Sequence, residues 1–257
     1  MLKMLVVTDM HYTDIYEHIG RYHSQSPERL KEAFAKRLDK CDIVINLGDT
    51  ADDLEDGMDQ EKALKEMAGY FRECKKPYYT VIGNHDTAMD KRKFCEIIGM
   101  PHRYYCFDTE DFKCIVLDAS MNDKNEPYPK EEMDWHVSFI DDRQIKWLER
   151  ELEKSDKSVL VFMHELLFYR DRVSPDDLVV RNRDEVYEVL EKSGKVKAVI
   201  SGHWHKGDLV CGDNMIPQLT LCSMAEGIDS AYSFITVTED KITVEGFGRQ
   251  PSYEVEI

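Results

Sequence analysis

Residues 2–11 read LKMLVVTDMH, a short apolar run that ends in an aspartate and a histidine. The apolar residues over positions 3–8 are typical of a strand buried in a sheet. In an extended chain alternate side chains point the same way, so Asp9 and His11 are expected to face one cation while Met10 faces away. This strand is therefore predicted to end in a pair of metal-binding side chains.

Four further predicted strands also end in residues that can bind a metal. In open α/β sheets ligands bind beyond the carboxyl ends of the strands, so these residues are expected to meet at one edge. Each glycine among them lets the backbone turn, or approach another group closely. His203 and His205 repeat the spacing of Asp9 and His11, and Trp204 is expected to turn toward packing. The segments are Gly48-Asp49, Gly83-Asn84-His85-Asp86, His164 and Gly202-His203-Trp204-His205.

Apolar runs and amphipathic stretches alternate from the N-terminal strand to His205. This alternation predicts strands separated by helices. The runs are rich in Val, Ile, Leu and aromatic residues, as buried strands should be. The predicted strands are Lys3–Thr8, Asp42–Leu47, Tyr78–Ile82, Tyr104–Phe107, Lys113–Leu117, Ser158–Met163 and Lys197–Ser201.

Four amphipathic stretches between the strands are predicted to be helices. The first is expected to start at Ser26-Pro27-Glu28, with Ser26 as N-cap and Pro27 at the first helical position. The last is expected to end near Gly194. Their apolar stripes, interpreted as core packing, are Leu30, Phe34 and Leu38; Leu64, Met67, Ala68 and Phe71; Ile145, Leu148 and Leu152; and Val186, Val189 and Leu190.

The pattern changes after His205, where strand follows strand with turns between them. We expect an antiparallel meander there. Along the chain, alternating strands and helices come first and strands alone follow. This order suggests two sheets with helices outside them, an α/β fold of the α+β type. No Pro-, Gly- or Ser-rich linker divides the sequence, so we predict a single domain over residues 1–257. The four runs of the meander are Asp208–Cys211, Ile216–Cys222, Tyr232–Val237 and Lys241–Phe247.

The composition is strongly acidic. Lysine and arginine number 34 against 51 aspartates and glutamates, which gives a net charge of −17. An acidic surface repels nucleic acid and anionic membranes, so we expect neither as a partner. No apolar run approaches the roughly 20 residues of a membrane-spanning helix. The sequence has seven cysteines, none of them in a C-x-x-C pair, and no recognisable export signal. We therefore expect a cytoplasmic protein with reduced thiols. The composition predicts no oligomeric state.

The candidate ligands are imidazoles, carboxylates and one carboxamide, without a thiolate. This donor set favours Mn, Fe, Zn, Co or Ni over Cu(I) or a structural zinc cluster. Their number exceeds the four ligands of a structural zinc site. Two metal ions about 3.5–4 Å apart, sharing a carboxylate and a hydroxide, would use all of them. The ligands are Asp9, His11, Asp49, Asn84, His164, His203 and His205.

The complete series of motifs, in this order, resembles the calcineurin-like metallophosphoesterase superfamily. The series runs from Asp9-x-His11 to Gly202-His203-x-His205 and spans about four-fifths of the chain. Its GNHD and GHWH forms look most like the branch that contains cyclic-nucleotide and glycerophosphodiester phosphodiesterases. The resemblance implies a four-layer αββα sandwich of two mixed β-sheets flanked by helices.

The resemblance also implies a role for each residue of the motifs. His85 would lie near the leaving-group oxygen as a general acid or charge stabiliser. Asp86 would orient His85 without touching a metal. Asp9, His11 and His205 would hold one ion, Asn84, His164 and His203 would hold the other, and Asp49 would bridge the two.

The leading hypothesis is a dinuclear metal-dependent hydrolase that cleaves a small-molecule phosphodiester. The metal ions would lower the pKa of water, and the hydroxide between them would attack phosphorus in line with the leaving group. One alternative is hydrolysis of a nucleoside-diphosphate-linked pyrophosphate, because residues 231–252 look similar to manganese-dependent ADP-ribose/CDP-alcohol diphosphatases. A phosphomonoesterase and a non-catalytic metal-dependent binding protein also stay open.

Three further residues are candidates for contact with the substrate. Arg21 and His23 follow the first metal motif, and Arg172 lies in a predicted loop that could overhang the site. An arginine suits phosphate recognition through its fork of N–H donors. The acidic run of residues 52–56 is interpreted as a solvated loop or a helix start. The alternative that Asp52 or Asp53 lies near the metals stays open.

Overall fold

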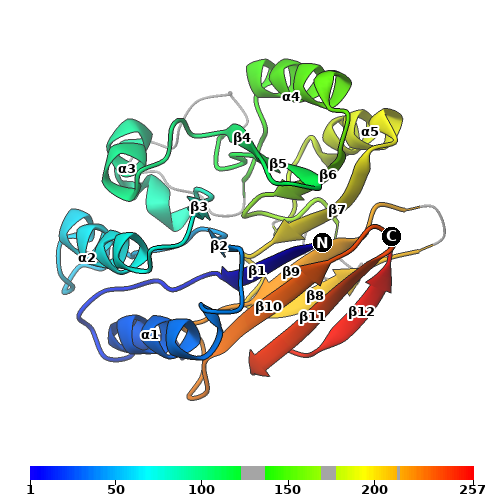
Figure 1. Cartoon of the computed structure of the whole chain (residues 1–257). Helices are drawn as coiled ribbons and strands as arrows, with labels where there is room; N and C mark the ends of the chain where they lie inside the picture. The colour runs from blue at the N-terminus through cyan, green and yellow to red at the C-terminus, as the bar shows by residue number, and fades with distance from the viewer. Residues whose placement is uncertain (123–136, 169–177, 213–214) are drawn as a thin grey trace.

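The computed structural model describes residues 1–122, 137–168, 178–212 and 215–257. Two six-stranded β-sheets pack face to face, and helices cover their outer faces (Figure 1). The predicted αββα sandwich of two mixed sheets is therefore confirmed. Within the described residues, no helix is both long enough and apolar enough to cross a membrane.

The first sheet has the strand order β12-β11-β10-β1-β2-β3. Its strands β1, β2 and β3 are parallel, so their carboxyl ends lie at one edge. Strand β10 pairs antiparallel with β1 and is followed by β11 and β12, which extend the sheet. The strands are β1 (Leu2–Val7), β2 (Ile43–Asn46), β3 (Tyr78–Thr80), β10 (Ala231–Val237), β11 (Lys241–Gly248) and β12 (Tyr253–Glu256).

The second sheet has the strand order β4-β5-β6-β7-β9-β8. Strands β5, β6, β7 and β9 are parallel, while β4 and β8 are antiparallel edge strands. The ends of β6 and β7 therefore deliver their following residues to one edge. The strands are β4 (Tyr105–Asp108), β5 (Phe112–Val116), β6 (Ser158–Phe162), β7 (Val196–Ser201), β8 (Lys206–Val210) and β9 (Gln218–Cys222).

The core follows the two-residue period of the strands. Along β6, Leu160 and Phe162 pack between the two sheets. Val159 and Val161 point the other way and pack under α4 and α5. The helices are α1 (Ser26–Arg37), α2 (Gln60–Glu73), α3 (Lys91–Ile98), α4 (Asp142–Lys154) and α5 (Arg183–Ser193), and the short 3₁₀ helices are η1 (His23–Gln25) and η2 (His85–Ala88).

The predicted meander is wrong, because its strands are divided between the sheets. Strands β8 and β9 form a hairpin in the second sheet, and β9 pairs parallel with β7. The chain then crosses to the first sheet, where β10 pairs with β1. The helix α3, the strand β12 and the short 3₁₀ helices η1 and η2 were not predicted.

The start of α1 also differs from the prediction. The helix begins at Ser26 itself, with Gln25 as its N-cap and Pro27 in the first turn. The Ser26 hydroxyl does not cap the helix but donates to the carbonyl of Met10. It therefore fastens α1 to the loop that follows β1.

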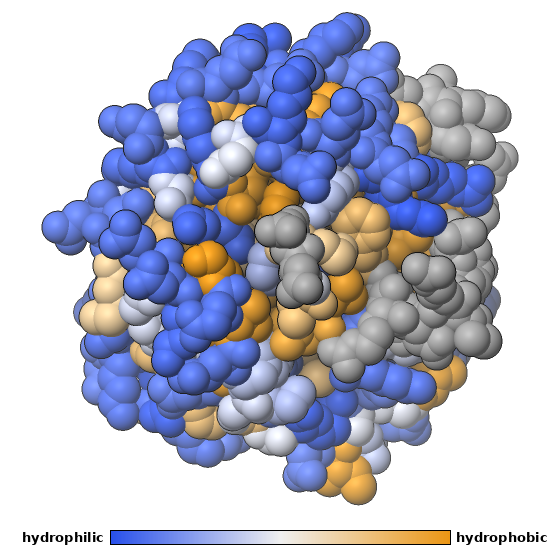
Figure 2. Space-filling model, turned by 90° about the vertical axis from the view of Figure 1, so that its right-hand side faces the viewer, coloured by the Kyte–Doolittle hydropathy of each residue, from blue (hydrophilic) through white to orange (hydrophobic). Residues whose placement is uncertain are grey.

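Hydrophilic side chains cover most of the face seen in Figure 2, and apolar side chains gather near its centre. This surface agrees with the net charge of −17. None of the seven cysteines, all of which lie in the described residues, forms a disulfide.

Candidate metal centre

The structure brings the predicted ligands together where the two sheets meet at their carboxyl edges. The first sheet contributes those that follow β1, β2 and β3, and the second contributes those that follow β6 and β7. All are buried except His205, whose side chain is 13% exposed. Residues far apart in the sequence thus share one site: Asp9, His11, Asp49, Asn84, His164, His203 and His205.

The ligand atoms fall into two groups with Asp49 between them. In one group, His205 Nε2 lies 3.2 Å from Asp9 Oδ1 and 3.0 Å from His11 Nε2. In the other, Asp49 Oδ2 lies 3.1 Å from His164 Nε2, and His203 belongs to the same group. The same Asp49 oxygen is 3.6 Å from His11 Nε2, so it can reach a cation in either group.

The hydrogen bonds of three histidines orient their rings so that Nε2 faces the place where a cation could bind. His11 Nδ1 contacts Asp52 at 2.8 Å, His205 Nδ1 contacts Glu226 at 2.9 Å, and His164 Nδ1 contacts the Leu47 carbonyl at 2.8 Å. These acceptors hold a proton on Nδ1 and turn each Nε2 toward the site, as in metal-binding histidines. Burial opposes the charge of His164 and His205, but the neighbouring carboxylates outweigh burial and raise the pKa of both, so a bound metal ion would take the place of the Nε2 proton.

Nε2 of His11 and Nε2 of His205 lie 3.0 Å apart, a distance that fits either a proton shared by the two rings or a metal ion bound by both. Burial adds to this argument, because buried polar atoms normally have a hydrogen-bond partner. Four ligand atoms are buried without one: Asp9 Oδ1, Asn84 Oδ1, His164 Nε2 and His203 Nε2.

The turns that carry the ligands are strained. Asp9, His11, Asp49 and His203 have φ angles of 50°, 43°, 50° and 67°. Non-glycine residues avoid this left-handed region, at a cost of about 1 kcal/mol or more each. Such strain persists where a site requires it, and here four ligands share it.

This conformation corrects the expectation that Asp9-x-His11 and His203-x-His205 are extended. The two side chains of each pair still point to one place. The backbone turns orient them, and not the alternating side-chain directions of a strand. Trp204 also differs from the expectation, since it lines a cavity and is only partly buried.

Two glycines make room for the carboxylates. A Cβ on Gly83 would lie 2.2 Å from Asp49 Oδ1, and a Cβ on Gly202 would lie 2.7 Å from Asp9 Oδ2. Both distances are far below van der Waals contact. Gly83 and Gly202 are therefore required by the close approach of other groups, as the sequence suggested, and on Gly202 a Cβ would also meet Thr8 Oγ1 at 2.1 Å.

His85 is oriented by Asp52, and not by Asp86 as expected. Asp52 Oδ1 lies 2.9 Å from His85 Nδ1. The Asp86 carboxylate instead accepts backbone N–H groups from Asp49, Thr50 and Gly83. Asp86 therefore joins the turns after β2 and β3. Asp52 is 1% exposed, so the interpretation of this acidic run as solvated is wrong at its first residue.

The electrostatics of the site favour charged carboxylates. Burial opposes the charge of Asp9 and Asp49, but the surrounding histidines outweigh burial and hold the pKa of both below the usual value. Burial and the neighbouring His164 lower the pKa of His203 to about 3, which leaves a neutral imidazole. Burial also opposes the charge of His85, but Asp52 and Asp49 raise its pKa to about 9.

A cavity of about 430 Å³ is lined by His85 and by four of the predicted ligands, Asp49, Asn84, His203 and His205. Arg21, one of the predicted substrate contacts, lines it together with Lys206. His23 does not line it, since it is 1% exposed and its Nδ1 lies 2.6 Å from the His11 carbonyl. Arg172 lies outside the described residues.

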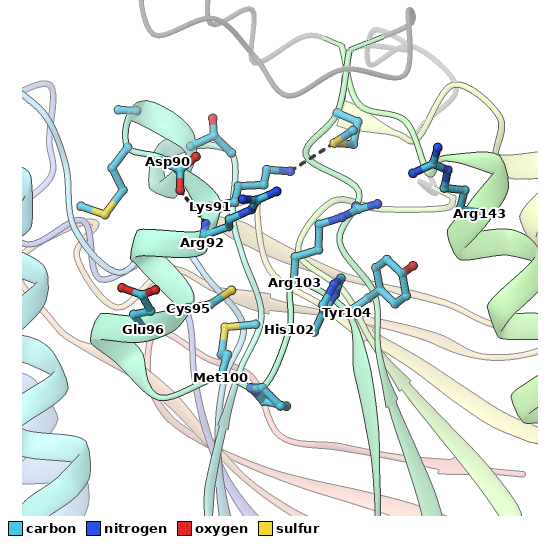
Figure 3. A pocket seen from close by; sticks show the side chains of 15 residues that line it. Asp90, Lys91, Arg92, Cys95, Glu96, Met100, His102, Arg103, Tyr104 and Arg143 are labelled. Carbon is cyan, nitrogen blue, oxygen red and sulfur yellow. Dashed lines mark hydrogen bonds between the residues drawn. The ribbon is translucent and has the colours of Figure 1, made fainter.

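A larger cavity of about 990 Å³ lies between α3, residues 100–104 and α4 (Figure 3). It contains none of the predicted ligands. Lys91 and Arg103 line it, and each lies 2.8 Å from an oxygen of the buried Asp118. The positive charges of Lys91 and Arg103 are therefore paired with the carboxylate of Asp118 inside the protein.

A profile of the calcineurin-like phosphoesterase family matches residues 2–207. The chain belongs to the calcineurin-like phosphoesterase family. The predicted resemblance is therefore confirmed. Calcineurin-like phosphoesterases are metal-dependent phosphoric ester hydrolases, and this chain is such an enzyme, in agreement with relatives named as phosphodiesterase, diphosphatase and phosphatase.

Two curated calcineurin-like relatives and one solved structure illustrate the similarity. A manganese-dependent ADP-ribose/CDP-alcohol diphosphatase from Arabidopsis thaliana is 25% identical over 98% of this chain and 96% of its own. A probable cyclic nucleotide phosphodiesterase from Rhodopseudomonas palustris is 25% identical over 80% of this chain and 72% of its own. A dimetal phosphatase from Danio rerio shares the fold, with a TM-score of 0.84 at 20% identity over 99% and 98% of the two chains.

Proposed function

We propose that this enzyme hydrolyses a small-molecule phosphodiester at the candidate metal centre. The observation that carries the proposal is the convergence of candidate ligand atoms on one place: Nε2 of His205, which lines the cavity, lies 3.0 Å from Nε2 of the buried His11 and 3.2 Å from Oδ1 of Asp9. His85 lines the same cavity. A proton donor therefore lies beside the place where two cations would bind a phosphate.

The proposed metal ligands are those that the sequence predicted. Asp9, His11 and His205 would hold one ion, Asn84, His164 and His203 would hold the other, and Asp49 would bind both. The donor set suits Mn, Fe, Zn or Co. When bound, two such ions would lower the pKa of water and neutralise charge on the phosphate oxygens. Two divalent ions exceed the charge of Asp9 and Asp49, so the site attracts an anion within an acidic protein.

His85 is proposed to give a proton to the leaving-group oxygen. Its Nδ1 is held by Asp52 at 2.9 Å, which leaves Nε2 as the ring atom that can reach the substrate. Asp52 stabilises the imidazolium form and fixes the plane of the ring. General acids positioned in this way contribute about 10²–10⁴-fold to a rate.

A second candidate is hydrolysis of a nucleoside-diphosphate-linked pyrophosphate. The similarity to the ADP-ribose/CDP-alcohol diphosphatase favours it, because that similarity covers almost the whole of both chains. Arg21 and Lys206 add support, since these cations line the cavity and could bind a second phosphate. Phosphomonoester hydrolysis is a further alternative, and a serine/threonine-protein phosphatase from Danio rerio is among the relatives.

One assay separates these functions. Hydrolysis of bis-p-nitrophenyl phosphate, p-nitrophenyl phosphate and ADP-ribose is measured with Mn²⁺ and with a chelator. We expect metal-dependent turnover that is fastest for the diester. Turnover of the monoester alone contradicts the leading proposal, and preference for ADP-ribose supports the second. Absence of metal-dependent turnover of all three contradicts the enzymatic function.

A further inference from the structure

The strained residue Ile19 stands at the mouth of the metal cavity. His18 and Arg21 exchange two backbone hydrogen bonds of 3.0 Å, which define a tight turn with Ile19 and Gly20 at its centre. Both central residues have positive φ, 49° and 83°. Such turns favour Asn or Gly, and a β-branched residue with positive φ is a true outlier.

Backbone hydrogen bonds also hold this turn against the loop of residues 225–227, next to the candidate metal centre. Gly227 N donates to Gly20 O at 2.9 Å, and Tyr22 N donates to Ala225 O at 2.8 Å. The same loop carries Glu226, whose carboxylate contacts Nδ1 of His205. The position of Ile19 relative to the metal ligands is therefore determined by the fold.

Packing does not explain the isoleucine. Its side chain is 73% exposed, so the strain is not offset by burial in the core. Ile19 lines the cavity together with two other apolar side chains, Leu178 and Trp204. The rest of the lining is polar or charged. The cavity thus offers a small apolar region beside the cations.

We propose that Ile19 is a specificity-determining residue that packs on a flat, apolar ring of the substrate. The inference rests on the proposed function, because the ring is taken to be one substituent of the phosphodiester. Trp204 lines the same cavity, with the Lys206 ammonium 5.3 Å from the centre of its ring, and aromatic side chains stack on rings with little geometric demand. Arg21 and Lys206 suit the phosphate end. A cavity of about 430 Å³ has room for a phosphate with one ring system.

The test compares thymidine 5′-phosphate, whose thymine ring has a flat apolar face, with methyl phosphate, which carries no ring. Binding of thymidine 5′-phosphate and of methyl phosphate to the Mn²⁺-loaded protein is measured by calorimetry. Wild-type protein should prefer the thymidine ligand. Ile19→Ala and Ile19→Gly should lower this preference about tenfold, equivalent to about 1.4 kcal/mol, and leave the affinity for methyl phosphate unchanged.

The glycine variant separates a role in binding from a role in folding. Glycine accepts positive φ, so Ile19→Gly should not lower the urea midpoint of unfolding. Ile228→Ala is the matched control, because Ile228 is 80% exposed on the neighbouring loop and does not line the cavity.

Two results overturn the inference: a wild-type protein without preference for the thymidine ligand, or Ile19 variants that weaken both ligands equally. Failure of the proposed function is distinguishable. In that case diesters are not hydrolysed by wild-type protein, while the binding preference still depends on Ile19.

Discussion

Oδ1 of Asp52 lies 2.9 Å from Nδ1 of His85. The same oxygen lies 2.8 Å from Nδ1 of His11, so one buried carboxylate contacts both a proposed metal ligand and the proposed general acid. A change in the position of either ring is transmitted to the other through this atom. The metal centre and the proton donor are therefore one hydrogen-bonded unit.

Asp52→Asn is expected to damage metal binding and turnover together. The neutral amide gives no charge to stabilise the His85 imidazolium, and it contacts His11 less strongly. Changes to such partners of metal-bound histidines cost about 10–100-fold in metal affinity or activity. Metal titration and steady-state kinetics test this expectation. Asp56→Asn, an exposed change in the same loop, should alter neither, and equal effects of the two changes would contradict the role of Asp52.

His85→Ala is expected to separate turnover from metal content. His85 is proposed as a proton donor and not as a ligand, so both metals should remain bound. Turnover should fall about 10²–10⁴-fold, and most for substrates with poor leaving groups, which need the proton most. Metal analysis and a leaving-group series measure this. His102→Ala, at an exposed histidine of the larger cavity, is the control. Loss of both metals would show that His85 has been misassigned.

Asp49→Ala is expected to lower the metal content itself. Asp49 Oδ2 lies 3.1 Å from His164 Nε2 and 3.6 Å from His11 Nε2, so its removal takes a ligand from both groups. The protein should retain one metal ion or none after gel filtration, against two in the wild type. A variant that retains two ions would contradict the bridging role.

Local sequence signals were sufficient to predict where the proposed metal ligands lie in the fold. Each lies directly after a strand, and the parallel strands bring these ends to one edge without further information. The backbone turns at Asp9 and His203 were not predictable, because a left-handed conformation of a non-glycine residue is imposed by the surrounding fold.

Long-range pairing and burial explain the errors. The runs after His205 were correctly predicted as strands, but only their partners decide which sheet they join, and β10 pairs with a strand more than 200 residues earlier. The short helix α3 offers two turns of pattern, too few for a clear stripe. Asp52 belongs to an acidic run typical of solvent, and only the tertiary fold buries it against His11 and His85.

The stability of the protein should depend on Asp118 in acid. Lys91 of α3 and Arg103 contact its carboxylate, and Arg103 also contacts Asp141. The charge of Asp118 in turn disfavours the charge of the buried Glu165. Burial opposes the charge of Asp118, but Lys91 and Arg103 outweigh burial and hold its pKa below the usual value. A carboxyl group whose pKa is lower in the folded state than in the unfolded chain stabilises the fold at pH values above its unfolded pKa of about 3.9. This stabilisation is lost as the pH falls through the pKa of the folded state.

Asp118→Asn should therefore lower the free energy of unfolding by about 3–5 kcal/mol at pH 7, because it leaves the buried Lys91 without its carboxylate and Arg103 with Asp141 alone. The difference from wild type should stay constant down to about pH 5 and shrink below about pH 4, where the Asp118 carboxyl of the unfolded chain begins to bind a proton. Urea unfolding at pH 7, 5 and 3 measures it. Asp108→Asn is the control, since Asp108 is 62% exposed and lies 3.9 Å from Lys157. A difference that is absent at pH 7, or unchanged at pH 3, would show that the Asp118 charge does not stabilise the fold in this way.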